Sequence, residues 1–337
     1  MILLLGASGY LGRAFADELH RRGAAVTPFS RQTVDYTRFD ILFNYVRGAR
    51  PDFIINAAGF AGDPVADGCE SNRAETVRAN TLLPQTIARV CYLTSTPWGH
   101  VSSGSIYSGA KVALNGGLAV ERDLNQPDLR KRLESQPQDF HGFDESDEPN
   151  FTFRSPPCTF YSGTKALAEE AMRGFSQHYL WRPGIVFDEV DHPRNFLAGT
   201  LRHALVRDNV NSFSHRADFV RTCLDLWDSK APFGTYHIVN PGMLSGRQLL
   251  DALQRKIRPQ GAFQLLSENE GGNTPRHRAL HPHCILSSSK LASAGIKLRP
   301  LSLALDDALE NWKPSESQEN INAQPTRISS GPFSTPS

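Results

Sequence analysis

A tyrosine and a lysine four residues apart, Tyr161 and Lys165, are the two side chains in this sequence best placed to do chemistry together. Residues at positions i and i+4 lie on one face of a helix, so the phenol and the ammonium can point into one site. A nearby ammonium favours the phenolate, and it should lower the tyrosine pKa from its usual value of about 10. Such a phenol suits proton transfer near neutral pH, and the pair predicts the reduction of a carbonyl group.

The motif Tyr-x-x-x-Lys is short, and the sequence contains it twice, because Tyr107 and Lys111 have the same spacing. Strong helix formers follow Lys165, whereas Asn115-Gly116-Gly117, which would interrupt a helix, soon follows Lys111. The later pair is therefore the catalytic candidate. The alternative is that its two side chains merely lie on a helix surface.

Length, charge and cysteine content narrow the class of protein. A chain of 337 residues suits one large domain or two closely joined ones, and a formal net charge of +1 gives no sign of a nucleic acid or an anionic membrane as partner. No apolar run approaches the roughly 18 residues that a membrane span needs. The five cysteines are scattered, which argues against a disulfide framework and against a zinc site. We expect a metal-free protein of the reducing cytoplasm that acts on a small molecule.

The start of the chain is typical of a dinucleotide-binding fold. Ile2 to Leu5 is a short apolar run that predicts a strand buried on both faces, and a glycine-rich turn and an amphipathic helix follow it. Glycines let the backbone approach a pyrophosphate, whose charge a helix N-terminus favours. The alternative is a plain tight turn. The residues of this turn that we expect to bind a cofactor are Gly6, Ser8, Gly9, Tyr10, Leu11 and Gly12.

The end of the next expected strand, Ala25 to Phe29, bears on which cofactor binds. Sites that prefer NAD usually place an acidic residue about 20 positions after the glycines, but Ser30-Arg31 occupies that region here. Because arginine can pair with a 2′-phosphate, we expect NADP(H) to be preferred, with NAD(H) as the alternative. Asp35 is expected either near the adenine ring or as a turn cap.

Small and polar residues follow two later strands, at the edge of the sheet where ligands bind in such folds. Asn56-Ala57-Ala58-Gly59 follows the strand that begins at Asp52, and its small residues would let the cofactor pass closely. The segment Ser102 to Tyr107 follows the strand Pro97 to Val101 and supplies hydroxyl groups, one of which could polarise a substrate carbonyl. A Ser-rich turn is the alternative. Asn80, inside a long helix expected from Ser71 to Tyr92, is a further candidate.

Alternating strands and helices predict an α/β fold, a Rossmann-type doubly wound parallel sheet with a smaller C-terminal α/β domain. We expect an NADP-binding domain over residues 1–185 that returns near 215–240. Residues 110–157 break the pattern and are expected to form either a lid or substrate-shaping insertion beside the site or a disordered excursion. Residues 186–312 are expected to form mainly the substrate domain, and 313–337 a disordered tail.

Beyond the helix of Tyr161, the pattern predicts one strand from Tyr179 to Phe187 and helices near Leu197 to Arg207 and Ser245 to Ile257. Arginines in this half could clamp a diphosphate, although most surface arginines are merely solvated. The candidates are Arg194, Arg202, Arg216, Arg276 and Arg278.

With these motifs in this order, followed by Arg182-Pro183, the chain resembles the extended short-chain dehydrogenases/reductases. Within that superfamily it is most similar to the dTDP-4-dehydrorhamnose reductases and to the plant-type bifunctional UDP-4-keto-6-deoxyglucose 3,5-epimerase/4-reductases. The motifs that carry the resemblance are Asn56-Ala-Ala-Gly59, Cys69-Glu-Ser71, Glu75-Thr-x-Arg-x-Asn80, Pro149-Asn-Phe-Thr152, Phe160-Tyr-Ser-x-Thr-Lys165, Pro193-Arg-Asn-Phe196 and Asn240-Pro-Gly242.

The resemblance implies a reaction and a role for each matching residue. Ser103 would be the hydroxyl donor, Tyr161 the proton donor, and Lys165 the residue that lowers the tyrosine pKa and holds the nicotinamide ribose. Hydride would pass from NADPH to the C4 ketone of a nucleotide-linked 4-keto-6-deoxyhexose, with Pro183 lining the nicotinamide. The resemblance implies substrate contacts from Ser105, Asn195 and Arg276.

Two positions depart from the epimerase/reductase pattern, which has a cysteine where this chain has Ser105 and a lysine where it has Gly199. Serine is a poor acid or base near neutral pH, so reduction alone is the main expectation. The bifunctional enzyme is the alternative, with His192 or Cys158 as substitutes. A third hypothesis is a non-catalytic NADP-binding regulatory subunit, because the β subunit of methionine adenosyltransferase has a similar fold. Besides the nucleotide sugar, a second copy of the chain is a candidate partner, in a homodimer.

Overall fold

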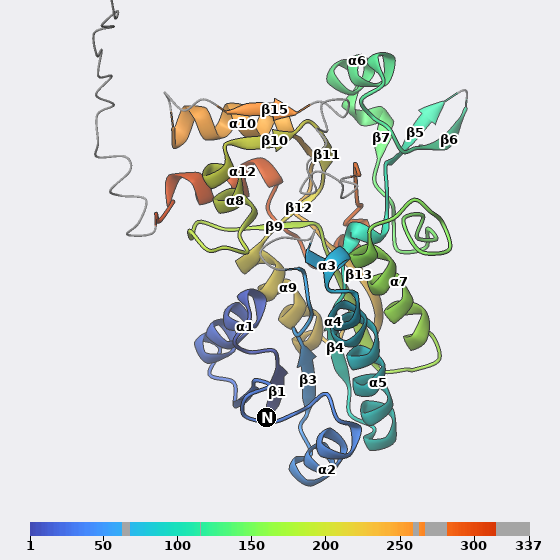
Figure 1. Ribbon diagram of the computed structural model, residues 1–337, viewed down its shortest axis with the longest axis vertical. Helices are drawn as coiled ribbons and strands as arrows, with labels where there is room; N and C mark the ends of the chain where they lie inside the picture. Colours follow the sequence, from blue (N-terminus) through green and yellow to red (C-terminus); the bar gives the residue numbers. More distant parts are fainter. Residues whose placement is uncertain (63–67, 115, 259–262, 267–281, 315–337) are drawn as a thin grey trace, which may run out of the picture.

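A six-stranded parallel sheet forms the centre of the molecule (Figure 1). The computed structural model describes residues 1–62, 68–114, 116–258, 263–266 and 282–314. The strands of this sheet are β1 (Ile2–Leu5), β2 (Val26–Phe29), β3 (Phe53–Asn56), β4 (Trp98–Val101), β8 (His178–Pro183) and β13 (Gly234–Ile238). Their order is β13-β8-β4-β3-β1-β2, and every neighbouring pair is parallel. The expected Rossmann-type α/β class is therefore confirmed.

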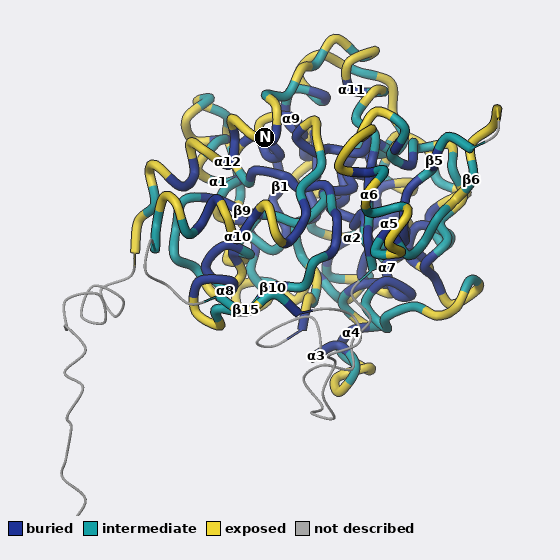
Figure 2. Tube along the Cα trace, turned by 90° about the horizontal axis from the view of Figure 1, so that it is seen from above, coloured by how far each residue is buried: buried dark blue, intermediate teal, exposed yellow. Residues whose placement is uncertain are grey.

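Helices cover both faces of the sheet, which explains the apolar sequence of its strands. In β1, Ile2 and Leu4 join one hydrophobic core while Leu3 and Leu5 join the other, because successive side chains alternate across a strand. Figure 2 shows the buried chain gathered in the middle of the molecule. One core lies under α1 (Tyr10–Arg21) and α9 (Arg216–Asp228), the other under α2 (Phe39–Ala49), α5 (Leu83–Thr94) and α7 (Phe160–Met172).

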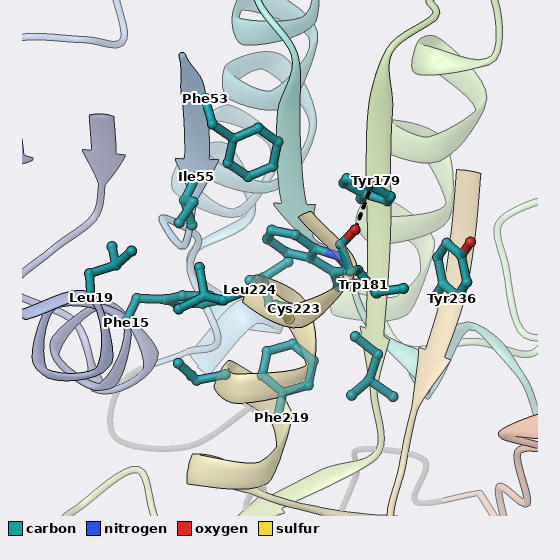
Figure 3. Close-up of a cluster of buried hydrophobic side chains, with 14 of the residues drawn as sticks. Phe15, Leu19, Phe53, Ile55, Tyr179, Trp181, Phe219, Cys223, Leu224 and Tyr236 are labelled. Atoms are coloured by element: carbon teal, nitrogen blue, oxygen red, sulfur yellow. Dashed lines mark hydrogen bonds between the residues drawn. The ribbon is translucent and has the colours of Figure 1, made fainter. Parts of the chain in front are cut away.

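Aromatic rings fill the core beneath α1 and α9 (Figure 3). Trp181 of β8 is fully buried, and its ring stacks with Phe15 and Tyr179 at centroid distances of 5.9 and 6.1 Å. A Cβ atom at Gly99 of β4 would lie 2.0 Å from the Trp181 ring, so glycine alone fits beneath the indole. This packing fixes the spacing of β4 and β8, the two strands that lead into the candidate site.

The long helix expected from Ser71 to Tyr92 is divided into several segments. They are α3 (Gly68–Ser71), α4 (Arg73–Val77), the π-helical turn η1 (Arg78–Leu82) and α5. Asn80 lies in the middle of the π-helical turn, a distortion that is frequent at functional sites. The side chain of Asn80 bonds to the loop after β3, which accounts for the widened turn.

The single strand expected from Tyr179 to Phe187 is also divided, and this prediction was wrong. After β8, the segment β9 (Ile185–Phe187) leaves the central sheet and pairs with β12 (Phe213–His215). Gly184 separates the two strands, and a Cβ atom there would lie 2.3 Å from the Ser212 carbonyl oxygen. The chain thus changes sheets where another backbone crosses closely, which no local pattern reveals.

The C-terminal part has its own hydrophobic core, and one predicted boundary is corrected there. The helix expected from Leu197 to Arg207 ends at His203, because Ala204 turns left-handed with φ 50° and leads into a strand. The second expected helix is present and begins with a capping box between Ser245 and Gln248. The elements are α8 (Phe196–His203), β10 (Leu205–Arg207), β11 (Val210–Asn211), β14 (Leu244–Ser245), α10 (Gly246–Lys256), β15 (Gln264–Leu266), α11 (Ser289–Ser293) and α12 (Leu301–Glu310).

The irregular segment after β4 is folded in the part of it that the structure describes, so a disordered excursion is excluded for those residues. An antiparallel sheet of order β6-β5-β7 packs with a helix beside the C-terminal part (Figure 1). Its core joins Val112, Leu133 and Phe140 to Val210 and Ile285. The elements are η2 (Gly104–Ile106), β5 (Ala110–Leu114), β6 (Gly117–Glu121), α6 (Pro127–Ser135), η3 (Pro137–Asp139) and β7 (Phe140–His141). Among the helices of the described ranges, none has the length and apolar character needed to cross a membrane.

Candidate active site

The glycine-rich turn and the segment after β3 meet at the carboxyl edge of the sheet, where the strand order reverses between β1 and β3. Ligands of open α/β sheets bind at such a switch point. Gly6 has φ +78°, and a Cβ atom there would lie 2.6 Å from the Ala58 nitrogen. A Cβ atom at Gly12 would lie 2.0 Å from the Gly6 carbonyl oxygen. Ser8 and Gly9 are exposed at the N-terminus of α1, so the turn is tight within the protein and open toward solvent.

Tyr10 does not face outward with the rest of this turn. Its ring stacks on His192 at a centroid distance of 4.8 Å, and the Arg216 guanidinium lies 4.5 Å above the ring. Burial and the nearby Asp188 carboxylate raise the pKa of the Tyr10 phenol. The side chain therefore ties the cofactor turn to the C-terminal part, while Leu11 packs partly into the core beneath α1.

The residues expected at the adenosine end lie on the surface beyond β2. Arg31 Nη1 pairs with Glu75 Oε1 of α4 at 2.8 Å, so its guanidinium has a carboxylate partner across the edge of the site. The Ser30 hydroxyl lies 3.4 Å from Thr33 Oγ1. Asp35 accepts hydrogen bonds from the amide and the hydroxyl of Thr37, which makes it the turn cap that was one of its two expected roles.

Buried hydrogen bonds hold the segment Asn56 to Gly59 in place. The Asn56 amide nitrogen lies 2.9 Å from His100 Nδ1, and Asn56 Oδ1 accepts a 3.1 Å bond from the Ala58 amide. His100 is fully buried and was not identified from the sequence. Ala57 packs against the core on the α1 side. Residues of β3 and β4 thus together hold this turn in place.

Asn80 closes the same segment from the π-helical turn. Its Oδ1 accepts a 2.8 Å bond from the Phe60 amide, and its Nδ2 donates a 2.8 Å bond to the Phe60 carbonyl. A Cβ atom at Gly59 would lie 3.2 Å from Asn80 Oδ1 and 3.5 Å from Lys165 Nζ. Gly59 therefore lies where α7 and the π-helical turn approach the cofactor edge.

Tyr161 and Lys165 lie one turn apart at the start of α7, which Thr159 caps by accepting a 3.0 Å bond from the Ser162 amide. Lys165 Nζ lies 5.9 Å from the centroid of the Tyr161 ring and donates a 3.1 Å bond to the Val101 carbonyl at the end of β4. The structure therefore brings the helix pair to the strand that leads into the serines.

Ser103 lies in that Ser-rich turn, near the Tyr161 phenol. Its hydroxyl is close enough to the phenol to lower the Tyr161 pKa, although its shortest hydrogen bond is to Ser105 Oγ, at 2.7 Å. Ser103, Tyr161 and Lys165 thus meet at the carboxyl end of β4, and Pro183 ends the neighbouring strand β8.

The Tyr161 pKa is raised overall in this structure, contrary to the expectation of a net lowering. Burial raises the pKa of Tyr161 to about 12, and the influence of the Ser103 hydroxyl only partly opposes it. Burial also lowers the pKa of Lys165 to about 8, against the opposing effect of Glu169. Desolvation is the largest influence on the pKa of each group. A phenol that stays protonated near neutral pH is still the form that can give a proton to an alkoxide.

The rival motif, Tyr107 and Lys111, serves a structural purpose instead. Lys111 lies on the strand β5 and pairs with Asp144 at 2.8 Å and Asp147 at 2.6 Å. The Tyr107 hydroxyl donates a 2.8 Å bond to the Asp147 carbonyl. Lys111 thus holds the loop of residues 144–147 against β5 within the inserted segment, and Tyr107 ties the same loop to the Ser-rich turn.

Of the three residues expected to contact the substrate, the structure places Ser105 near the site, buries Asn195 and does not describe Arg276. Asn195 is 1% exposed and caps α8, accepting from the Leu197 amide at 3.1 Å and donating to Asp188 Oδ1 at 2.7 Å. Its amide is therefore already engaged inside the protein, because the loop before α8 needs a cap. Ser105 lies beside Ser103 and stays near the site. Arg276, like Arg278, lies outside the described residues.

The other proposed diphosphate arginines also have partners within the protein. Arg194 Nη1 donates to the Ala61 carbonyl at 3.4 Å, beside the cofactor edge. Arg202 pairs with Asp191 at 2.8 Å, and Arg216 pairs with Asp188 at 2.6 Å. Arg194 contacts the loop after β3, and Arg216 contacts the glycine turn at Tyr10, whereas Arg202 has its partner in Asp191.

The two suggested substitutes for the missing epimerase cysteine are not primed for acid/base work. Burial raises the pKa of the Cys158 thiol, and His192 is stacked on Tyr10 with a lowered pKa. The thiol that acts on both Tyr161 and Lys165 is Cys69, and burial raises its pKa as well. Within the described ranges, no cluster of three or more His, Cys, Asp or Glu side chains could hold a metal ion.

Comparison with known proteins agrees with this geometry. The chain is 27% identical over 258 residues to the bifunctional dTDP-4-dehydrorhamnose 3,5-epimerase/dTDP-4-dehydrorhamnose reductase of Arabidopsis thaliana. The matched residues make up 76% of this chain and 75% of that protein. Its fold is similar to that of the L780 UDP-rhamnose synthase of Acanthamoeba polyphaga mimivirus, with a TM-score of 0.74, 18% identity and coverage of 92% and 98% of the two chains.

A further solved structure with the same fold is dTDP-4-dehydrorhamnose reductase of Bacillus anthracis in complex with NADP, with a TM-score of 0.69, 19% identity and coverage of 92% and 96%. The family model described as the RmlD substrate binding domain matches residues 1–313, a span that includes the glycine turn, the serines, the Tyr161 helix and the C-terminal part. From the turn at the switch point to the last described helix, this chain therefore belongs to the RmlD substrate binding domain family.

Proposed function

We propose that this protein is an NADPH-dependent reductase that acts on the C4 ketone of a nucleotide-linked 4-keto-6-deoxy sugar. The observation that carries the proposal is the meeting of Ser103, Tyr161 and Lys165 beside the glycine turn, at the edge of the sheet where a dinucleotide binds. The reductase and UDP-rhamnose synthase names of its relatives support the substrate class.

The residues present fit a nicotinamide dinucleotide. The close backbone contacts at Gly6 and Gly12 leave Ser8 and Gly9 exposed at the start of α1, where a pyrophosphate is favoured. Lys165 lies at the Gly59 end of the same edge, where it would hold the nicotinamide ribose, and Asn80 fixes the backbone beside it. When bound, the reduced cofactor supplies the hydride.

The chain's own groups would complete the reduction. The Ser103 hydroxyl would donate a hydrogen bond to the ketone oxygen and so stabilise the negative charge that develops there. The Tyr161 phenol, which is protonated near neutral pH, would give its proton to that oxygen. The Lys165 ammonium would favour the phenolate left behind, because opposite charges attract more strongly in a buried site.

A substrate screen tests the proposal. UDP-, dTDP-, GDP- and CDP-linked 4-keto-6-deoxyhexoses would be offered with NADPH and with NADH, while absorbance at the reduced-cofactor band is followed. We expect oxidation of NADPH with at least one of these sugars. Cofactor binding without turnover of any of them would favour the regulatory-subunit alternative.

The bifunctional alternative is tested in the same reaction run in deuterated solvent. Ser105 replaces the expected acid/base cysteine, and burial raises the pKa of both nearby thiols, Cys69 and Cys158. We therefore expect a product without deuterium at C3 and C5. Incorporation at these carbons before reduction would establish epimerase activity.

The preference for NADPH should depend on Arg31. Replacing Arg31 with alanine should weaken NADPH binding about tenfold and change NADH binding by no more than about twofold, because a charge-assisted bond to the 2′-phosphate is lost. Fluorescence titration of both cofactors measures this. Arg38→Ala is a matched control, because both arginine side chains are 61% exposed and carboxylate-paired. Equal losses for the two cofactors would contradict a 2′-phosphate role.

Three further proposals concern the domain division, the oligomeric state and the cellular compartment. The division into an NADP-binding domain to residue 185 and a substrate domain to 312 would be tested by limited proteolysis. A homodimer would be tested by light scattering after gel filtration. The reducing cytoplasm is the proposed compartment, because all five cysteines are free thiols.

A further inference from the structure

A buried carboxylate lies one helical turn beyond Lys165. Glu169 is 7% exposed, and its Oε1 and Oε2 accept bonds from Arg182 Nε at 3.0 and 3.2 Å. A second nitrogen of the same guanidinium, Nη2, also pairs with Glu169, and Ser102 donates its hydroxyl hydrogen bond to Glu169 Oε1. Four residues separate Glu169 from Lys165, so the two side chains share a face of α7.

These bonds join the three elements that carry the candidate site. Glu169 lies on α7 with Tyr161 and Lys165, Ser102 directly precedes Ser103 after β4, and Arg182 directly precedes Pro183 at the end of β8. One carboxylate therefore fixes the helix against both strand ends. Arg182 Nη1 extends the network by donating to the Tyr107 hydroxyl at 2.8 Å and by lying 3.1 Å from His237 Nε2.

Glu169 is also the charge that acts on Lys165. The titratable groups that face Lys165 are Glu169 and Tyr161 on α7, Cys69 on α3 and His100 on β4. Burial raises the pKa of Cys69 and of Tyr161, and it lowers that of His100 well below its usual value, so these three stay neutral between pH 7 and about 8. Glu169 opposes the burial that lowers the Lys165 pKa to about 8.

We infer that Glu169 is a positioning residue of this site, which keeps Lys165 as an ammonium and holds the Ser103 turn and the Pro183 strand end against α7. A buried ion pair is not needed for stability, because apolar residues of similar volume often replace such pairs without loss. What argues for a role in the reaction is that the pair joins α7 to Ser102 and Arg182, the neighbours in sequence of Ser103 and Pro183. The inference rests on the proposed reductase function.

The test is the pH dependence of kcat/KM for the Glu169→Gln enzyme, with NADPH and the sugar that the wild type reduces. In the wild type, activity should fall as pH rises through about 8, where Lys165 loses its proton while Tyr161 keeps its own until about 12. Glutamine removes the negative charge that favours the ammonium, so the fall should begin near pH 7. The loss relative to wild type should be about tenfold at pH 9 and small at pH 6.

A second variant guards against misfolding, because Glu169→Gln leaves the buried Arg182 charge without its partner. In the double variant Glu169→Gln/Arg182→Met both charges are absent, and the alkaline fall is expected to move to lower pH by less than in Glu169→Gln, because the Arg182 cation that disfavours the ammonium is gone as well. Glu169→Asp, which keeps the charge, should restore the fall to about pH 8. An alkaline fall that stays at the wild-type pH in both Gln variants would overturn the inference.

A matched control separates positioning from general stability. Asp218 lies on α9 and is 3% exposed, and its buried carboxylate pairs with Arg299 Nε at 2.7 Å. Asp218→Asn should lower the melting temperature and leave the alkaline fall in place; a shift as large as that of Glu169→Gln would overturn the inference. If the wild type binds NADPH but reduces no keto sugar, the proposed function fails instead, and fluorescence titration of NADPH tells the two failures apart.

Discussion

Replacing Tyr161 with phenylalanine should lower kcat for ketone reduction by roughly 10²–10⁴-fold, the range that a positioned general acid contributes. The affinity for NADPH should change by no more than about twofold, because phenylalanine keeps the ring that packs beside Lys165. Steady-state kinetics with the wild-type substrate gives kcat, and fluorescence titration gives the cofactor dissociation constant. The expected loss in kcat with retained binding is the signature of a proton donor.

Tyr92→Phe is the control for this substitution. Tyr92 is 62% exposed on α5, so removal of its hydroxyl should leave kcat unchanged. A Tyr161→Phe enzyme that keeps more than half of the wild-type kcat would remove Tyr161 from the mechanism. A loss of both kcat and NADPH binding would point instead to a disturbed fold, which the melting temperature would reveal.

Replacing Gly12 with alanine should abolish measurable NADPH binding and destabilise the protein. The added Cβ atom would meet the Gly6 carbonyl oxygen at 2.0 Å. This oxygen belongs to the backbone and cannot rotate away as a side chain could. Forced overpacking of this kind costs about 1–3 kcal/mol, and it displaces the turn that we propose holds the pyrophosphate. Thermal unfolding and cofactor titration measure the two effects.

Gly48→Ala is the matched control for Gly12→Ala. Gly48 is exposed within α2, and an added Cβ atom there would meet nothing within 4 Å. Alanine should stabilise this helix by about 0.5–1 kcal/mol and leave NADPH binding intact. Wild-type cofactor affinity in the Gly12→Ala enzyme would show that the turn does not approach the dinucleotide.

Much of the fold follows from local patterns that the structure reproduces. The apolar run from Ile2 to Leu5 predicts a strand buried on both faces, and helices do cover both. The helix formers after Lys165 predict α7 and thereby select the correct Tyr-x-x-x-Lys pair. Patterns fail where the chain changes partners, as at Gly184, because a long-range backbone crossing leaves no periodic signal.

The residues of the site also divide into those that a local pattern predicts and those that only contacts between distant segments bring together. Glu169 could have been noticed from its spacing of four residues after Lys165, but its partner Arg182 comes from another strand. His100 had no signal at all, since a histidine in an apolar strand reads as an ordinary buried residue. Asn195 was expected to meet the substrate, yet the structure uses its amide to cap α8, because the nearest unsatisfied donors are those of its own helix.

By itself, the sequence determined the glycine turn and the shared helix face of Tyr161 and Lys165, because both depend on backbone geometry within a few neighbouring residues. The tertiary structure decided that Ser103 reaches Tyr161 and that Glu169 pairs with Arg182, since these contacts join distant parts of the chain. It also decided the protonation of the pair: burial, a property of the assembled site, raises the Tyr161 pKa and lowers that of Lys165.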